Sequence, residues 1–207
     1  MRFRPISPDY PLVLASASPR RRRLLEQVGL PFLCSPSKID EDDSFLGGAP
    51  APALLAREKA LAVSERHRNT WILGADTIVT KGHRVLGKPR DPGDARRMLT
   101  MLSGAEHRVI TGICILDPLL RTAHREEVIT LVKMKALTDE EIRAYIASGE
   151  PFGKAGGYAI QGIGSFMVES ITGSYTNVVG LPICALVKAL LACGALNSFP
   201  LLPKPKR

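Results

Sequence analysis

The stretch LVLASASPRRRRLLEQVG, residues 12–29, decides the fold, because it combines an apolar run, a loop signal and a helix signal. Its apolar start predicts a short buried strand over Leu12 to Ala15. Ser18 is expected to cap a helix from Pro19 to about Val28, since proline suits the first helical position. Gly29 is a typical stop at the C-terminal end. The stretch therefore predicts a strand, a loop and a helix in direct succession.

The loop and first helical turn of this unit carry hydroxyl and guanidinium groups together. A helix N-terminus attracts anions, and here it is joined by the hydroxyls of Ser16 and Ser18 and by four arginines, residues 20–23. Arginines in the first turn oppose the helix dipole, so their presence favours phosphate binding. Neighbouring helical residues diverge, so we expect Arg20 and Arg21 to face a ligand and leave the other two undecided. A solvated basic face is the alternative.

Further along the chain, apolar patterning, glycines, prolines and caps mark alternating strands and helices. Strands are predicted at 32–34, 71–80, 109–116, 128–135 and 166–169, and helices at 52–67, 92–102, 138–149 and 182–194. The pattern predicts an α/β fold with a mixed twisted sheet flanked by helices. We expect a short lead-in over residues 1–10, one catalytic domain over 11–196 and a flexible tail over 197–207.

Composition restricts the class of protein. The 207 residues, 45% of them hydrophobic, suit one compact domain or two lobes around a cleft. The net charge of +8 favours an anionic partner of unspecified kind. The four cysteines form no C-x-x-C pair and the four histidines are isolated, which argues against zinc or disulfides and predicts buried thiols in the reducing cytoplasm. The apolar runs are too short for a secretory signal or a membrane span.

Asp76 is out of place in its segment, because aspartate is depleted in strands and this one lies among Trp71, Ile72, Leu73, Ile78 and Val79. A carboxylate there would be desolvated unless a cation or hydrogen bonds hold it. It is either a metal ligand or a base that activates water, or a buried carboxylate paired with a nearby arginine. The motif alone does not favour a functional role over a structural ion pair.

Three further segments could contribute to an anion or nucleotide site. Lys59 and Lys88 can each act as a point charge on phosphate, although either alone is typical of a surface residue. Residues 82–88 match G-x-x-x-x-G-K, but Pro89 stands where a P-loop needs Ser or Thr, so a P-loop is rejected. Residues 153–164 hold five glycines, which allow close backbone approach, and Gln161, whose amide suits a base edge. A turn-rich hairpin is the alternative there.

Seven segments in order resemble the Maf family of nucleoside triphosphate pyrophosphatases, and the resemblance covers roughly residues 12–192. They are Leu14–Arg21, Arg57–Ala60, Gly74–Val79, Gly87–Asp91, Met98–Gly104, Lys154–Gly162 and Gly173–Pro182. The resemblance implies a two-lobed fold with a deep cleft, a homodimer, a divalent cation (magnesium or manganese) and cleavage between the α- and β-phosphates. The Tyr-x-Ile-Gln-Gly run at 158–162 resembles the branch that prefers dTTP and UTP. Removal of non-standard nucleotides and restraint of division are both open as the physiological role.

The resemblance also assigns residues. It implies that Asp76 is the catalytic base, and that metal ligands fall on Asp76 and Asp40. Phosphate contacts fall on Ser18, Arg20, Arg21, Lys59 and Lys88, with Ser16 beside them, and substrate choice falls on Arg20, Thr77 and Gln161. The chain departs from the family at two positions: Gly153 replaces an aspartate, and Asp40 replaces a glutamate, with Glu41 as a possible substitute.

Two other classes of protein remain as alternatives. A non-enzymatic nucleic-acid-binding regulator would explain the net charge of +8 and the arginine run. Against it, aromatic residues make up only 5% of the chain and no known nucleic-acid motif is present. A phosphosugar or nucleotide transferase would release a product other than the monophosphate.

Overall fold

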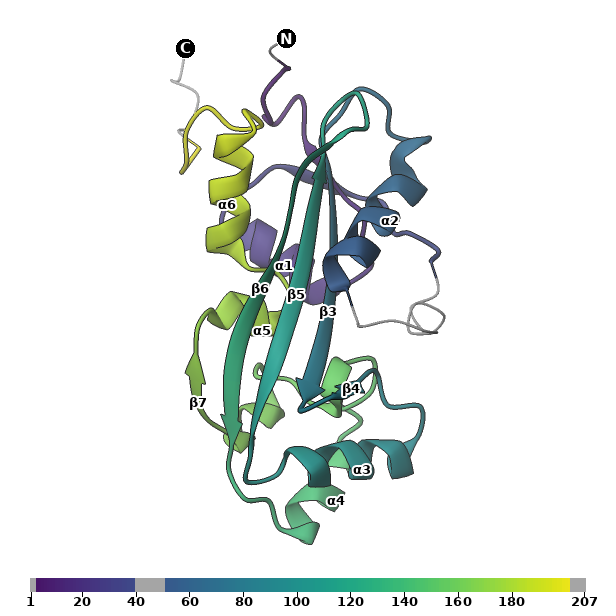
Figure 1. Ribbon diagram of the computed structural model, residues 1–207, viewed down its shortest axis with the longest axis vertical. Coiled ribbons are helices and arrows are strands. Elements are labelled where there is room, and N and C mark those ends of the chain that lie inside the picture. Colours follow the sequence, from purple (N-terminus) through teal and green to yellow (C-terminus); the bar gives the residue numbers. More distant parts are fainter. Residues whose placement is uncertain (1–2, 40–50, 202–207) are drawn as a thin grey trace.

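A computed structural model describes residues 3–39 and 51–201. Asp40 and Glu41, which the sequence suggested for a metal site, lie outside the described residues. Figure 1 shows an elongated molecule in which the long strands β3 (Ile72–Lys81), β5 (Glu106–Leu116) and β6 (Thr122–Met134) run along its length. Helices α1, α2 and α6 lie around one half of these strands, and α3 and α4 lie at the other end (Figure 1).

One mixed sheet organises the fold, in the order β2-β1-β3-β5-β6-β7, with β4 paired to β3. The first three strands are parallel and the remaining pairs are antiparallel. The shorter strands are β1 (Leu12–Leu14), β2 (Phe32–Cys34), β4 (Arg84–Leu86) and β7 (Val168–Thr172). The helices are α1 (Pro19–Gln27), α2 (Pro52–Ser64), α3 (Pro92–Leu102), α4 (Asp139–Ala147), α5 (Tyr175–Val179) and α6 (Ile183–Ala192), with 3-10 turns η2 (Ala155–Gly157) and η3 (Ile163–Met167). The predicted α/β class with a mixed sheet is confirmed.

The strand–loop–helix unit forms as its sequence predicts. Strand β1 lies between β2 and β3, and α1 begins at Pro19. The Ser18 hydroxyl accepts a hydrogen bond from the Arg21 backbone N–H at 3.4 Å, so it caps the helix. Gly29 has a φ of +66°, a left-handed conformation that favours glycine at a helix end. The loop before α1 is thus fixed at the carboxyl end of a central parallel strand.

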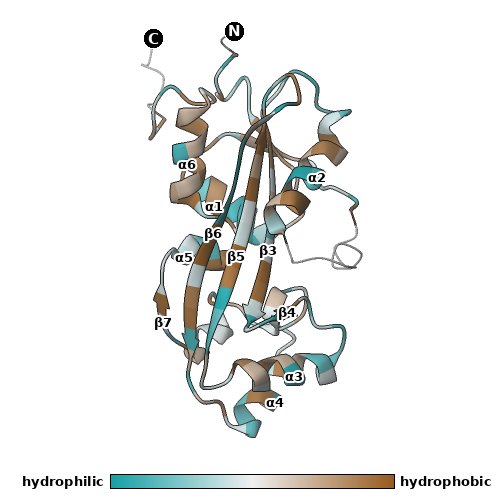
Figure 2. Cartoon of the chain, in the orientation of Figure 1, coloured by the Kyte–Doolittle hydropathy of each residue, from teal (hydrophilic) through white to brown (hydrophobic). Residues whose placement is uncertain are grey.

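Separate apolar clusters support the two halves of the sheet. Around β1 and β3, the cluster packs α1 and α6, with Leu25, Trp71 and Leu190 nearly inaccessible. At the other end, a second cluster packs α3 and α4 against the strands and includes Leu99 and Tyr145. In Figure 2, brown segments mark the apolar stretches of the long strands. These clusters hold two lobes on shared strands, which leaves the middle of the sheet for a site.

Some element boundaries differ from the sequence prediction. Strand β6 starts at Thr122 instead of 128, because the mostly polar and mostly solvent-exposed residues 122–127 pair with β5. Helix α2 ends at Ser64, three residues before the predicted end. The segment 166–169 is split between a 3-10 turn and a strand that continues to Thr172. Helix α5, of five residues, was not predicted at all.

The segments outside the predicted domain have definite contacts where the structure describes them. Ile6 is buried, and the Trp71 indole N–H donates to the Arg4 carbonyl at 3.0 Å. Phe199 and Leu201 pack against the cluster around α6. No helix in residues 3–39 and 51–201 is long and apolar enough to cross a membrane.

The expectation that the cysteine thiols are buried is wrong for two of the four. All four are free, but only Cys114 is buried, Cys193 is partly buried, and Cys34 and Cys184 are exposed. The reason is position: β2 lies at the edge of the sheet, and Cys184 lies on the outer face of the first turn of α6.

Candidate active site

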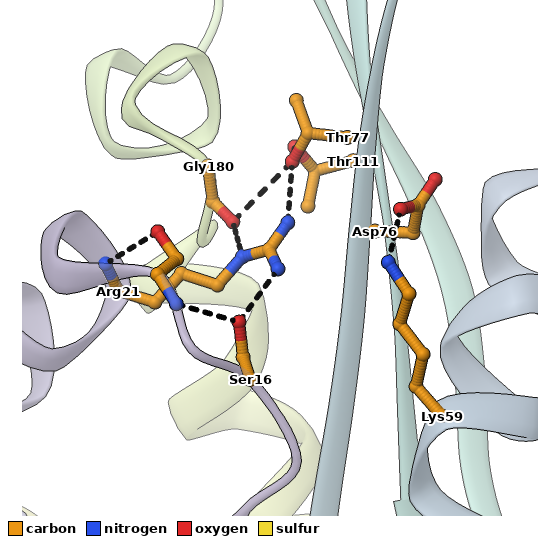
Figure 3. Close-up of polar contacts among 8 residues, drawn as sticks. Ser16, Arg21, Lys59, Asp76, Thr77, Thr111 and Gly180 are labelled. Atoms are coloured by element: carbon orange, nitrogen blue, oxygen red, sulfur yellow. Dashed lines mark hydrogen bonds and ion pairs between the residues drawn. The ribbon is translucent and has the colours of Figure 1, made fainter. Parts of the chain in front are cut away.

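Asp76 lies in the middle of β3 and is paired with Lys59 of α2. The lysine Nζ donates to Asp76 Oδ1 at 2.7 Å, and both residues are at least 96% buried (relative exposures of 3% and 4%). Figure 3 shows the pair on the side of β3 that faces α2. The sequence left open whether this carboxylate is a metal ligand or base, or is paired with an arginine. The structure shows it in an ion pair, but with a lysine instead of an arginine.

Two glycines allow α2 to come close enough for this contact. A Cβ on Gly74 would lie 1.8 Å from the Ala56 carbonyl oxygen, and one on Gly112 would lie 2.1 Å from the Ala53 backbone nitrogen. Gly112 is the β5 residue that pairs with Asp76, so both glycines lie next to the carboxylate in the sheet. Any side chain at either position would push the helix, and Lys59 with it, away from Asp76.

Arg21 connects three segments that are far apart in the sequence. Its Nε donates to the Gly180 carbonyl at 2.8 Å, and its two terminal nitrogens donate to Ser16 Oγ and Thr77 Oγ1, each at 3.0 Å (Figure 3). The residue is 8% exposed. A planar guanidinium can hold several acceptors in a fixed arrangement, which a lysine cannot. Arg21 therefore fixes the loop before α1 against β3 and against the turn after α5.

The Thr77 hydroxyl continues this network into the sheet. It lies 3.0 Å from Thr111 Oγ1, whose own proton is donated to the Asn177 carbonyl at 3.1 Å. Thr77 therefore accepts from Arg21, and its own proton is available to Thr111 Oγ1 or to the Gly180 carbonyl, which lies 3.5 Å away. With its hydroxyl engaged in this way, Thr77 is better placed to position Arg21 than to contact a ligand through that oxygen.

A cavity of about 300 Å³ opens beside these groups. It is lined by the loop before α1, the middle of β3, the residues around Lys88, the glycine-rich segment and the end of α5. This volume is at the lower end of the range for small-molecule sites. The predicted residues that line it are Ser16, Ser18, Arg20, Arg21, Asp76, Thr77, Lys88 and Gln161.

The charges on the described lining residues are mainly positive. Arg20, Arg21, Lys88 and Lys154 are cationic, and Asp76 is the one carboxylate among the described lining residues. Burial lowers the pKa of the Arg20 guanidinium, which nevertheless stays charged in a protein. Burial, and then the nearby charge of Arg20, lower the pKa of the Lys154 ammonium. A ligand with several negative charges would relieve this mutual repulsion.

The glycine-rich segment closes one side of the cavity through unusual backbone conformations. Gly156 and Gly162 have φ values of +73° and +77°, which favour glycine. Tyr158 lines the cavity, and its hydroxyl lies 2.7 Å from His107 Nε2 of β5. Burial lowers the pKa of His107 to about 4, so the imidazole is neutral near pH 7. The segment contains two 3-10 turns, η2 and η3, rather than the hairpin considered as an alternative.

The predicted set is thus brought together with one difference in arrangement. Lys59 is not among the described lining residues; it lies behind Asp76 and contacts it directly. Side chains alternate along a strand, so Asp76 and Thr77 point to opposite faces of β3, as Figure 3 shows. Arg22 and Arg23 are exposed and line no part of the cavity. Residues 82–88, which match the G-x-x-x-x-G-K pattern, contain the turn and second strand of the β3–β4 hairpin, in agreement with the rejection of a P-loop.

Several residues of the site were not predicted from the sequence. Thr111 and Gly180 complete the Arg21 network, and Lys154 and Gly153 line the cavity although neither was included in the predicted site. Thr111 lies in a strand of ordinary β-branched residues, so nothing in its sequence context marks it. Lys154 could have been found from the sequence, since it is a cationic residue within the glycine-rich segment that was expected to approach a ligand.

Comparison with known proteins gives a consistent result. The family model for Maf-like proteins matches residues 11–193. A protein of Syntrophotalea carbinolica named dTTP/UTP pyrophosphatase is 48% identical over 194 residues, covering 92% of this chain and 88% of its own. Proteins of the same name are 52% identical in Ruminiclostridium cellulolyticum (83% and 90% covered) and 50% identical in Citrifermentans bemidjiense (90% and 97% covered).

Proposed function

The chain belongs to the family of Maf-like proteins, and on that premise we propose that it hydrolyses nucleoside triphosphates to the monophosphate and pyrophosphate, with dTTP and UTP preferred. Relatives that are about half identical over most of their length carry the name dTTP/UTP pyrophosphatase. The enzyme is then a hydrolase acting on the acid anhydride between the α- and β-phosphates.

The observation that carries this proposal is the charge of the cavity. Four cationic side chains line it, at Arg20, Arg21, Lys88 and Lys154, against the single described carboxylate of Asp76. A triphosphate brings about four negative charges near neutral pH, which such a set can offset both in the ground state and as charge moves onto the leaving pyrophosphate. The N-terminus of α1 lines the same cavity at Ser18 and Pro19, so the positive end of the helix dipole adds to this charge.

Asp76 is proposed to take the proton from the attacking water. Lys59 holds one of its oxygens, Oδ1, so the carboxylate is oriented and stays compatible with its buried position. Oδ2 is then the oxygen that can accept a proton from water in line with the α-phosphorus. Lys59 acts in this scheme through Asp76, which is a different role from the direct phosphate contact that the sequence suggested.

The residues present also fit a divalent cation that arrives with the substrate. No group of three or more His, Cys, Asp or Glu side chains gathers in the described parts of the chain, so a full protein cage is not found there. Magnesium needs less, since it is commonly held by one or two carboxylates together with substrate phosphates and waters. As the alternative to taking the proton itself, Asp76 Oδ2 could hold magnesium or manganese, and Asp40 stays a proposal. When bound, such a cation would draw charge from the phosphates and lower the pKa of a coordinated water.

Base selection is proposed to rest on the glycine-rich segment. Gln161 lines the cavity and offers both a donor and an acceptor, which match the imide edge shared by thymine and uracil. Arg20 lines the same cavity, and Thr77 contributes to its shape by accepting a hydrogen bond from Arg21. Discrimination by a polar pocket is effective because a wrong base leaves buried polar groups without partners.

We extend the proposal to the setting of the enzyme. Residues 11–196 are taken as one catalytic domain, the enzyme as a homodimer in the cytoplasm, and removal of non-standard nucleotides as one candidate role. The four free cysteines support a reducing compartment. The nucleic-acid-binding alternative gains no support from the comparisons, because the relatives are named pyrophosphatases.

The test is a screen of the standard nucleoside triphosphates with magnesium or manganese, in which the inorganic product is identified. The proposal expects pyrophosphate and the monophosphate, with dTTP and UTP turned over fastest. Release of orthophosphate, or salt-dependent DNA binding without any turnover, would contradict it.

A further inference from the structure

We propose that Glu150 and Tyr145 are positioning residues that set the base specificity of this site by fixing the backbone on both sides of Gln161. This inference rests on the proposed function for its readout in substrate preference. It concerns two residues on the far side of the glycine-rich segment, and neither lines the cavity in the described part of the chain.

Glu150 holds the backbone just after Gln161. Its Oε2 accepts a hydrogen bond from the Gly164 N–H at 2.7 Å, and its Oε1 accepts one from the Ile163 N–H at 3.1 Å. A carboxylate that receives two backbone N–H groups forms charge-assisted hydrogen bonds, which are stronger than neutral ones. The Glu150 carbonyl also accepts from Lys154 Nζ, so one residue ties a cavity cation and the turn at Ile163 to the end of α4.

Tyr145 holds the backbone just before Gln161. Its hydroxyl accepts a hydrogen bond from the Ala159 N–H at 3.1 Å, and its ring is 2% exposed within the cluster of α3 and α4. Burial raises the pKa of this phenol, and its hydrogen bond to Glu150 raises it further. The phenol therefore stays protonated and links Ala159 to the carboxylate that holds Ile163 and Gly164.

The glycines on this segment match the two positioning residues. A Cβ on Gly162 would lie 2.1 Å from Glu150 Oε1, and one on Gly164 would lie 2.7 Å from the Tyr145 hydroxyl and 2.4 Å from the Ala159 carbonyl. Gly162 also has a φ of +77°. The segment can approach Glu150 and Tyr145 this closely only because Gly162 and Gly164 have no side chain.

The consequence for specificity follows from where Gln161 lies. Ala159 on one side and Ile163 and Gly164 on the other are each fixed by a hydrogen bond to a buried or half-buried side chain of the α4 region. Gln161 lines the cavity on a stretch of backbone that has no regular secondary structure of its own. Loosening either attachment would let the amide turn and accept a wrong base edge, without touching Asp76.

The test compares Glu150→Gln and Tyr145→Phe with Glu141→Gln in the full chain. Glu141 lies in the first turn of α4, and its carboxylate bonds Lys135 and the Thr138 N–H instead of the glycine-rich segment. Two quantities are measured: the ratio of kcat/KM for dTTP over dCTP, and amide hydrogen exchange at Ile163 and Gly164.

Glu150→Gln and Tyr145→Phe are expected to lower the dTTP/dCTP ratio by roughly tenfold, as weakening a buried hydrogen bond would. The kcat for dTTP should change by less than about threefold, since Asp76 is untouched. Exchange at Gly164 should accelerate in Glu150→Gln, while Glu141→Gln should change neither quantity even if its melting temperature falls.

Faster exchange with an unchanged ratio would overturn the specificity role, and unchanged exchange in Glu150→Gln would overturn the attachment itself. If the unaltered protein turned over no nucleoside triphosphate, the proposed function would fail, whereas the exchange measurement would still decide whether Glu150 holds the segment.

Discussion

The buried ion pair between Lys59 and Asp76 allows a quantitative prediction for Lys59→Met. Methionine keeps much of the length and the apolar stem of lysine but removes the ammonium that lies 2.7 Å from Asp76 Oδ1. The carboxylate then remains in a position that is 4% exposed, with no other side chain of the described residues hydrogen-bonded to it. The substitution thus leaves the Asp76 carboxylate as an uncompensated buried charge.

The expected magnitude follows from the burial of both partners. Removing one partner of a buried ion pair costs about 3–5 kcal/mol, far more than loss of a surface pair. For a chain of this size, each kcal/mol lowers the melting temperature by about 2–4 °C, so a decrease of roughly 6–20 °C is expected. Breaking an exposed ion pair such as Arg96–Asp139 should change the free energy of unfolding by only about 0–1 kcal/mol.

The assay is thermal unfolding followed by circular dichroism at neutral pH, with the double variant Lys59→Met/Asp76→Asn as the control. Removing the charge as well as its partner should recover at least half of the lost stability, since the penalty comes from the orphaned carboxylate. A loss below about 1 kcal/mol in Lys59→Met, or a double variant no more stable than the single one, would refute this reasoning.

Three further predictions concern other parts of the site. Burial lowers the pKa of His107 from 6.5 to about 4, so between these pH values the unfolded chain binds more protons than the folded chain. The free energy of unfolding should therefore fall as the pH drops from 6.5 to 4. His107→Gln should make the melting temperature depend less on pH in this range. Gly112→Ala places a methyl 2.1 Å from the Ala53 nitrogen and should cost about 1–3 kcal/mol or more in chemical denaturation, whereas Gly93→Ala should stay within about 1 kcal/mol. Gln161→Ala should relax the preference for dTTP and UTP more than it lowers turnover, and an unchanged substrate profile would count against its role in base selection.

Much of the fold follows from local signals in the sequence. Helix α1 forms as predicted because Ser18, Pro19 and Gly29 mark its ends independently of tertiary contacts. Helix α3 begins after its Asp91 cap for the same reason. The start of strand β6 could not be predicted, because its first residues are mostly polar and are held by tertiary contacts, which are pairing with β5 and hydrogen bonds to α2. Helix α5 is too short for a periodic pattern to reveal it.

The site could be predicted in its residue types but not in its pairings. Asp76 is conspicuous as a carboxylate in an apolar strand, yet its partner depends on how closely α2 approaches Gly74 and Gly112, which only the packing shows. In the same way, the arginine run indicates anion binding, whereas the division of labour between Arg20 and Arg21 depends on Gly180, a residue 159 positions away. Contacts at such separations leave no local pattern.

The measurement that tests the central claim most directly is the turnover of Asp76→Asn, followed as pyrophosphate release from dTTP with magnesium. Asparagine keeps the shape of the side chain but is not a base, so kcat should fall at least about a hundredfold while circular dichroism shows a folded protein. Near-normal turnover by the folded variant would contradict the assignment of Asp76 as the group that activates water.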